Sequence, residues 1–173
     1  MTKFLFFSLF TTLLILSSCN SGDKTTVENK TTDTTVANYP YTIDKPDNWE
    51  TGSTENTQLA LTALKAWETG KMDEAVSYFG DSIQVRFDGM DQKMSNDQLK
   101  VFFGQIWNST FKIYMIDWKS VQSKDKSKAY VTVFYRESWK DEKGVTDSID
   151  AVNDFVIKNG KIVQLDNYFR KLH

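Results

Sequence analysis

The side chains that could carry out chemistry are few in this chain, and the rarest ones set the first limits. There is one cysteine, Cys19, and one histidine, His173, which is the last residue. A single histidine there excludes a His-based metal site and imidazole catalysis inside a folded pocket. No calcium loop, glycine-rich phosphate loop or serine nucleophile elbow occurs in the sequence. We therefore predict no metal, no cofactor and no standard catalytic group.

Composition narrows the class of partner. The 173 residues carry 21 basic and 23 acidic side chains, a net charge of −2, so they lack the basic surplus of a nucleic-acid-binding protein. The sequence is 40% hydrophobic and 14% aromatic, which suffices for one domain with a real core. We expect a single domain and no nucleic-acid partner.

The N-terminus has the pattern of a membrane-targeting signal. Lys3 precedes an apolar run over residues 4–16, which is too short to span a bilayer. The run ends in Leu16-Ser17-Ser18-Cys19, which resembles the lipobox of bacterial lipoproteins. That resemblance implies cleavage before Cys19 and acylation of its thiol, so that the chain is lipid-anchored to the cell envelope. Asn20 differs from the aspartate that often retains lipoproteins in the inner membrane, which favours the outer membrane.

The segment after the lipobox predicts a tether. Residues 20–38 are poor in large apolar side chains and rich in threonine, which is typical of a disordered segment. Residues 39–53 combine prolines with aromatics, and we predict no regular structure for them. The predicted division is a signal peptide over 1–18, a lipidated Cys19 with tether and leading segment over 19–53, and a folded domain over 54–173.

Hydrophobic periodicity predicts the order helix, helix, strand, helix and then four antiparallel strands. Ser53 or Thr54 can begin a helix that ends at Gly70, a short helix follows over 72–79, and Ser95 with Gln98 forms a capping box for a third. Asp81-Ser82 is predicted to turn the chain into a strand over 83–88. The remaining strands are expected over 111–121, 128–139, 145–157 and 161–169, with turns between them that include Asn159-Gly160.

This order of elements comes with local sequence motifs that resemble a known family. AWETGKMD at 66–73, YFGDSI at 78–83 and DFVIKNGKIV at 154–163 are similar to the SnoaL-like branch of the NTF2-like superfamily. The resemblance covers residues 54–170. It implies an α+β fold, a cone of three N-terminal helices packed in a strongly curved, mainly antiparallel sheet. It also implies a cavity at the open end and, in many members, a homodimer through the convex face of the sheet.

The resemblance allows the catalytic positions of a known enzyme to be compared with this sequence. In ketosteroid isomerase, an enzyme of the superfamily, the pocket holds a tyrosine, a base aspartate and a protonated aspartic acid. Those positions correspond to Ala63, Phe87 and Asn153 here, so all three catalytic groups are missing. Other enzymes of the superfamily depend on His/Asp or Asp/Arg/Asp groups. We therefore predict no catalytic residue.

The cavity residues follow from strand alternation, with Asn153 taken to point inward. The predicted ligand-binding residues are Asn153, Asn167, Arg136, Phe87, Phe155 and Trp107. On the strand over 128–139, the side chains predicted to point inward are Tyr130, Thr132, Phe134 and Arg136. The carboxylates predicted to face solvent are Asp117, Asp150, Asp154 and Asp166. A shift of one residue exchanges the two faces of a strand.

Each assignment has a purely structural alternative. Phe155 and Trp107 can be core residues, the two asparagines can bond each other, and Arg136 can be a surface ion-pair partner.

Three functions stay open. The first is a noncatalytic module that binds a small apolar ligand or a protein partner. The second is an isomerase, dehydratase or hydrolase of the SnoaL-like type with a non-standard pocket, which a carboxylate inside the cavity would favour. The third is a structural dimerisation module that pairs through outward apolar residues, for which the predicted set is Val131, Val133, Tyr135, Val152 and Val156.

Overall fold

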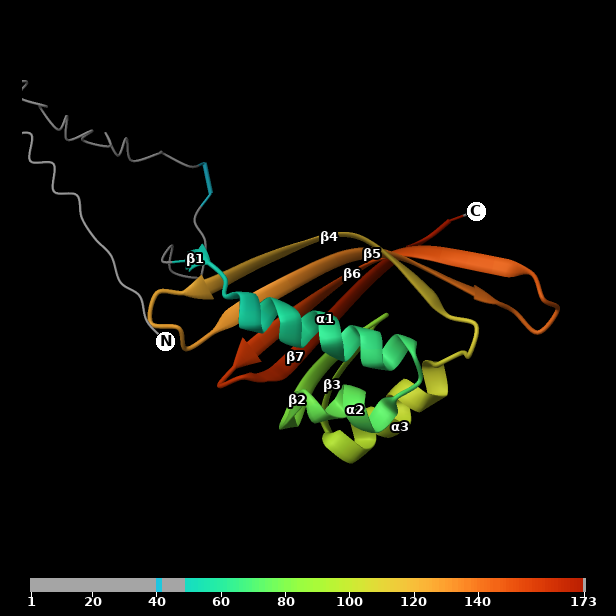
Figure 1. Cartoon of the computed structure of the whole chain (residues 1–173), viewed down its shortest axis with the longest axis horizontal. Coiled ribbons are helices and arrows are strands. Elements are labelled where there is room, and N and C mark those ends of the chain that lie inside the picture. Colours follow the sequence, from blue (N-terminus) through green and yellow to red (C-terminus); the bar gives the residue numbers. More distant parts are fainter. Residues whose placement is uncertain (1–39, 42–48, 173) are drawn as a thin grey trace, which may run out of the picture. The chain divides into compact units, whose positions relative to one another are not determined.

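The computed structural model describes residues 40–41 and 49–172 (Figure 1). The chain divides into two units, Met1–Thr42 and Ile43–His173, and the fold described below belongs to the second. The predicted signal peptide, Cys19 and the tether over residues 20–38 lie outside the described residues. No helix of the described part is long and apolar enough to cross a membrane.

The helices lie between strands early in the sequence, and the long strands follow. In chain order the elements are β1 (Trp49–Thr51), α1 (Thr54–Glu68), α2 (Met72–Ser77), β2 (Phe79–Phe87), β3 (Met90–Ser95), α3 (Asn96–Ile106), β4 (Lys112–Ser123), β5 (Ala129–Lys140), β6 (Thr146–Lys158) and β7 (Lys161–Lys171).

The strands form one sheet in the order β1-β4-β5-β6-β7-β2-β3. All neighbouring strands are antiparallel except β2 and β7, which run parallel. The helices lie on one side of the sheet, with α1 against β4 and β5 and α3 against β2 and β3 (Figure 1). The predicted α+β fold, with helices packed on a mainly antiparallel sheet, is confirmed.

The helices begin where their capping residues predict. The Ser53 side chain accepts a hydrogen bond from the Asn56 amide at 3.1 Å, at the start of α1. At α3 the predicted capping box is present, because the Ser95 amide donates to Gln98 Oε1 and the Gln98 amide donates to Ser95 Oγ. Both helices then bury an apolar stripe in the core, including Ala63, Leu64 and Trp67 of α1 and Leu99 and Phe103 of α3.

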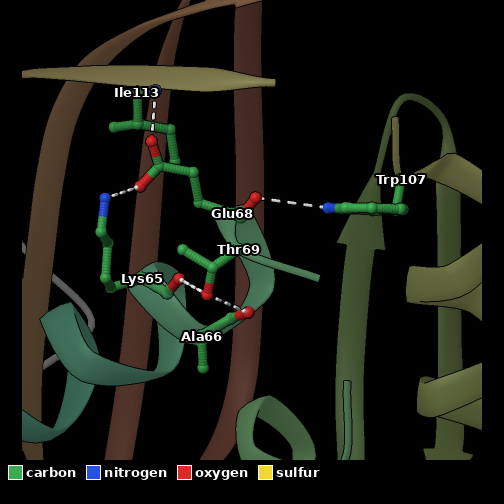
Figure 2. A network of polar contacts seen from close by, with 6 residues as sticks. All are labelled: Lys65, Ala66, Glu68, Thr69, Trp107 and Ile113. Atoms are coloured by element: carbon green, nitrogen blue, oxygen red, sulfur yellow. Dashed lines mark hydrogen bonds and ion pairs between the residues drawn. The ribbon is translucent and has the colours of Figure 1, made fainter. Parts of the chain in front are cut away.

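The end of α1 is joined to β4 by a polar network, which Figure 2 shows. One carboxylate oxygen of Glu68 accepts a hydrogen bond from the Ile113 amide at 2.9 Å, and the other pairs with Lys65 at 2.6 Å. The Glu68 carbonyl accepts a hydrogen bond from Trp107 Nε1 at 3.3 Å. Because Ile113 lies at the start of β4, this network fixes the helix end against the sheet.

Gly70 ends α1 in a conformation that suits glycine. Its φ is +74°, and a Cβ at this position would lie 2.6 Å from Trp107 Cζ2. The indole of Trp107 therefore covers the helix end as a packing residue.

Three local predictions need correction. Residues 49–51 form β1 and pair with residues 121–123 of β4, where no regular structure was predicted. The strand β2 begins at Phe79 and includes Asp81 and Ser82, where a turn was expected. In place of a turn, the pairing of β2 with β7 shifts register between Phe79 and Gln84. The edge strand β3 was not predicted, although Asp88-Gly89, with φ values of 40° and 78°, forms a tight hairpin turn before it.

Candidate functional site

A cavity of about 280 Å³ lies between the helices and the inner face of the sheet. Its walls are mostly aromatic and aliphatic, with polar side chains from β5, β6 and β7. The lining residues are Trp67, Phe87, Phe102, Phe103, Ile106, Phe111, Tyr135, Glu137, Trp139, Ile149, Asn153, Leu165, Asn167, Phe169 and Lys171. It contains Glu137 and Asn153, two of the four buried polar or charged residues of the described part.

A larger hollow of about 620 Å³ lies on the opposite face of the sheet, among residues that include Ile116, Phe134, Val152 and Tyr168. It is shallower, and the ionic side chains beside it already pair with one another, as Asp150 does with Arg170. We therefore place the candidate site in the smaller cavity, where buried polar groups meet an apolar wall.

Strand pairing sets the polar side chains in two rows across the inner face. Asn153 on β6 pairs with Asn167 on β7, and Asn167 pairs with Phe87 on β2. Further along, Glu137 on β5 pairs with Ile149 on β6, which in turn pairs with Lys171 on β7. Residues directly opposite each other in a sheet share a face, so each row points into the cavity.

The two asparagines form a hydrogen-bonded pair. Asn167 Nδ2 donates to Asn153 Oδ1 at 2.6 Å, and the Asn153 side chain also bonds the side chain of Tyr135. The other side-chain oxygen in this group, Asn167 Oδ1, is buried and has no hydrogen-bond partner within the described residues. The predicted bond between the asparagines is thus present, and it leaves an acceptor that an added ligand could use.

Glu137 is a buried charged side chain in the cavity wall. Its residue is 7% exposed, and no hydrogen bond or ion pair to its carboxylate is formed within the part of the chain that the structure describes. Desolvation by burial raises the pKa of Glu137 to about 7. At neutral pH the carboxyl group is therefore divided between its protonated and ionised forms.

Tyr135 lies beside Glu137 on the same face of β5 and is 2% exposed. Burial raises the pKa of Tyr135 far above its ordinary value, the charge of Glu137 adds to this shift, and the hydrogen bond with Asn153 opposes it. Tyr135 therefore stays protonated and can act as a hydrogen-bond donor at physiological pH.

The predicted register of β5 is wrong by one residue. Val131 and Val133 are fully buried and Tyr135 faces the core, whereas Arg136 is exposed and pairs with Asp150 at 2.9 Å on the outer face. Alternation could not decide the register, because both faces of this strand carry large apolar side chains. The β5–β6 hairpin does decide it, since Val133 pairs with the inward Asn153.

This correction explains why Glu137 was missed. Glu137 points inward at the position next to Arg136, which was predicted to point inward. Arg136 forms a surface ion pair instead, as its structural alternative proposed. Of the other predicted ligand residues, Asn153, Asn167 and Phe87 line the cavity, and their role in binding stays a prediction. Phe155 lies in the core at 2% exposure, and Trp107 covers the end of α1.

The four carboxylates predicted to face solvent lie on the outer face of the sheet, but Asp166 is buried there, at 8% exposure, so for Asp166 the prediction of solvent exposure is wrong. Asp117 pairs with Lys119, Asp150 with Arg136 and Arg170, and Asp166 with Arg86, and Asp154 accepts a hydrogen bond from Thr132. Within the described residues, no group of three or more His, Cys, Asp or Glu side chains could hold a metal ion.

No protein-family model and no curated protein matches the sequence. Solved structures do match. An LEH-like epoxide hydrolase of Mycobacterium tuberculosis is 13% identical, covering 68% of this chain and 84% of its own, with a TM-score of 0.54. An NTF2-like protein of unknown function from Cytophaga hutchinsonii is 10% identical, covering 66% and 98%, with a TM-score of 0.50.

A third match is RV0760c from Mycobacterium tuberculosis, whose crystal structure is a complex with estradiol-17beta-hemisuccinate. It is 10% identical and covers 68% of this chain and 95% of its own, with a TM-score of 0.56. The described domain therefore has the NTF2-like α+β fold, and the predicted resemblance to SnoaL-like domains is confirmed at the level of the fold. Proteins of this fold include enzymes, so the fold alone assigns no activity.

Proposed function

We propose that the domain binds a small ligand with an apolar body in the cavity on the inner face of the sheet. The observation that carries this proposal is the set of polar groups on the cavity wall that are unpartnered within the described residues: the buried atoms Asn167 Oδ1 and Trp67 Nε1, and the carboxylate of Glu137, a residue that is 7% exposed. Buried polar groups ordinarily have partners, so such a set in an aromatic-walled cavity favours a ligand that completes it. The volume of about 280 Å³ is at the low end for ligand sites, which favours a small molecule.

One structural neighbour supports the same reading. RV0760c holds a steroid ester, so a protein of this fold can accommodate a largely apolar molecule. The positions of the isomerase groups support binding over catalysis, because Phe87 and Asn153 line the cavity without supplying a base and Ala63 is buried in the core.

The experiment that tests binding is native mass spectrometry of the gently purified full-length chain. A retained small molecule, released on denaturation and absent from an unrelated protein purified alongside, would support the proposal. A chain that carries no added mass, and whose thermal unfolding does not shift with a panel of small aromatic compounds, would contradict it.

An enzyme is the second candidate, and Glu137 is the observation that favours it. A carboxyl group with a pKa near neutrality, placed in an apolar cavity, is matched to general acid or base work at physiological pH. A suitable probe is 5-nitrobenzisoxazole, from which a carboxylate removes the C3 proton as the N–O bond breaks to give a cyanophenolate. Turnover that follows the ionisation of Glu137 and is lost in Glu137→Gln would support catalysis. Equal rates in the two proteins would contradict it.

We further propose that the chain is a lipoprotein, anchored to the cell envelope through a lipid on Cys19. Of the two membranes, we propose the outer one. The support is the Leu16-Ser17-Ser18-Cys19 sequence after its apolar run. Metabolic labelling with palmitate tests this proposal. Incorporation in the wild type but not in Cys19→Ala supports it, and equal or absent incorporation in both contradicts it.

A homodimer through the convex face is a separate proposal. Of the predicted contact residues, Val131, Val133 and Tyr135 point into the core and Val156 is buried at 2% exposure, so these four cannot contribute. The outer face instead presents Ile116 and Tyr168, which are 55% and 63% exposed, next to Phe134 and Val152. Light scattering should report a dimer that Tyr168→Glu converts to a monomer. Val101→Glu, on the exposed face of α3, serves as the control, and a monomeric wild type would contradict the proposal.

A further inference from the structure

Glu137 is a buried carboxylate of the sheet that has no partner within the described residues. Asp117, Asp150 and Asp166 each lie within 4 Å of a lysine or arginine nitrogen on the outer face. No cation of the described residues pairs with Glu137, although Lys171 lies in the same cross-strand row on β7. Burying an ionised carboxylate without a cation is costly. A ligand that brings a positive charge to Glu137 would offset this cost.

The wall around this carboxylate is aromatic. The ring of Phe111 lies between two indoles, with its centroid 5.2 Å from that of Trp67 and 5.8 Å from that of Trp139, and all three residues line the cavity with Glu137. The faces of aromatic rings carry partial negative charge and attract cations, most strongly when water is excluded. An anionic ligand would meet repulsion from both the rings and the carboxylate.

The unpartnered polar atoms of the cavity are mainly acceptors. Ionised Glu137 can only accept hydrogen bonds, Asn167 Oδ1 is a buried acceptor, and Trp67 Nε1 is a buried donor. A ligand that carries N–H donors therefore satisfies more of the wall than one that carries oxygen acceptors alone.

We propose that the ligand is a small amine, with an apolar body held by the aromatic wall and a protonated nitrogen paired with the Glu137 carboxylate. This inference rests on the proposed function, that the cavity binds a ligand, and it adds the chemical class of that ligand.

A proton balance accompanies this binding. Burial raises the pKa of Glu137 to about 7, so part of the free protein is protonated there at neutral pH. A cation beside the carboxylate favours its ionised form, so amine binding releases a proton and weakens below pH 7.

Two other titratable groups line the cavity with Glu137: Tyr135 on β5 and Lys171 on β7. Tyr135 stays protonated because of its burial, and Lys171 is an exposed lysine on β7. The residues that α1 and α3 contribute to the cavity wall do not titrate: Trp67, Phe102, Phe103 and Ile106. Glu68, at the end of α1, is held by Lys65 and the Ile113 amide.

The test compares three probes of similar size: 2-phenylethylamine, 2-phenylethanol and 3-phenylpropanoate, titrated calorimetrically into the full-length chain at pH 8. We expect the amine to bind at least tenfold more tightly than the alcohol and the carboxylate. In Glu137→Gln the preference for the amine should disappear while the affinity for the alcohol is kept. Glu142→Gln, an exposed glutamate in the β5–β6 hairpin, should behave as the wild type.

A second measurement needs no variant. Amine titrations at pH 7 in phosphate and in Tris, which differ in ionisation enthalpy, should show proton release. Tighter binding of the alcohol or the carboxylate, an amine preference that survives Glu137→Gln, or proton uptake would overturn the inference while leaving a binding cavity in place. Binding of none of the probes would overturn both the inference and the proposed function.

Discussion

Glu137 and Tyr135 lie two residues apart on the inner face of β5, and burial raises the pKa of both side chains. The charge of Glu137 raises the pKa of Tyr135 further, so the two groups do not ionise together. Asn153 connects Tyr135 to Asn167, which extends the polar group across three strands. The chemistry of the cavity therefore depends on whether Glu137 carries its proton.

The first prediction concerns stability and pH. The folded pKa of Glu137, about 7, lies above its ordinary value of 4.5. The stability that this shift contributes is therefore fully present below about pH 4.5 and is lost as the pH rises through 7. Glu137→Gln removes this ionisation, so from pH 4.5 to pH 8 the variant should gain up to about 3 kcal/mol of unfolding free energy relative to the wild type. Urea unfolding at several pH values measures this difference.

Carboxylates with lowered pKa values impose the opposite trend on both proteins. Asp117, Asp125 and Asp150 lose stabilising interactions as the pH falls, and these contributions cancel in the comparison of variant with wild type. A difference that is the same at every pH would show that Glu137 titrates as an ordinary exposed glutamate, contrary to the structure.

The second prediction concerns the asparagine pair. Asn153→Ala should lower the unfolding free energy by about 1–3 kcal/mol, because it removes the acceptor of the 2.6 Å bond from Asn167 and the partner of Tyr135. Adding Asn167→Ala should cost less in this variant than in the wild type, since the bond is already lost. A double-mutant cycle by chemical denaturation measures the coupling, and strictly additive effects would show that the two side chains do not interact.

The third prediction concerns two glycines with similar backbones and different surroundings. Gly70 and Gly160 have φ values of 74° and 68°, but a Cβ at Gly160 would meet nothing within 4 Å. Gly160→Ala should therefore cost only the backbone strain, about 1–2 kcal/mol. Gly70→Ala should cost at least about 1 kcal/mol more, because Trp107 must move. Equal melting temperatures for the two variants would contradict the close packing of Trp107 on the end of α1.

The fourth prediction separates the two bonds of Glu68. Glu68→Ala removes the acceptor for the Ile113 amide and should destabilise the protein by about 1–2 kcal/mol. Glu68→Gln keeps an oxygen for that amide and should cost less. Lys65→Ala should have little effect, since the Lys65 side chain is 67% exposed. Thermal unfolding of the three variants ranks them, and a Lys65→Ala variant as unstable as Glu68→Ala would locate the stabilising bond in the ion pair instead.

The fold was largely predictable because its signals are local. Ser53, the Ser95–Gln98 capping box and the Asn159-Gly160 turn determine helix starts and a hairpin through contacts only a few residues apart. The edge strand β3 was equally accessible in principle, since Asp88-Gly89 is a strong hairpin signal. It was missed because its residues are mostly exposed and show little apolar alternation.

The candidate site was less predictable because its composition depends on strand register. Asn153, Asn167 and Phe87 were placed correctly, since one face of each of their strands is plainly apolar. On β5 both faces are apolar, and only the pairing of Val133 with Asn153 shows that Glu137 points inward. The raised pKa of Glu137 depends on how the neighbouring elements bury it, which the sequence of a single strand does not contain.

The central claim is that the cavity holds a ligand, and native mass spectrometry of the full-length chain tests it most directly. Ile149→Trp adds bulk inside the cavity, and Ser148→Trp adds the same bulk next to it on the opposite face of β6. We predict that the wild type and Ser148→Trp retain a small molecule that Ile149→Trp has lost. Equal masses of added ligand in all three proteins, or none in any of them, would contradict the account.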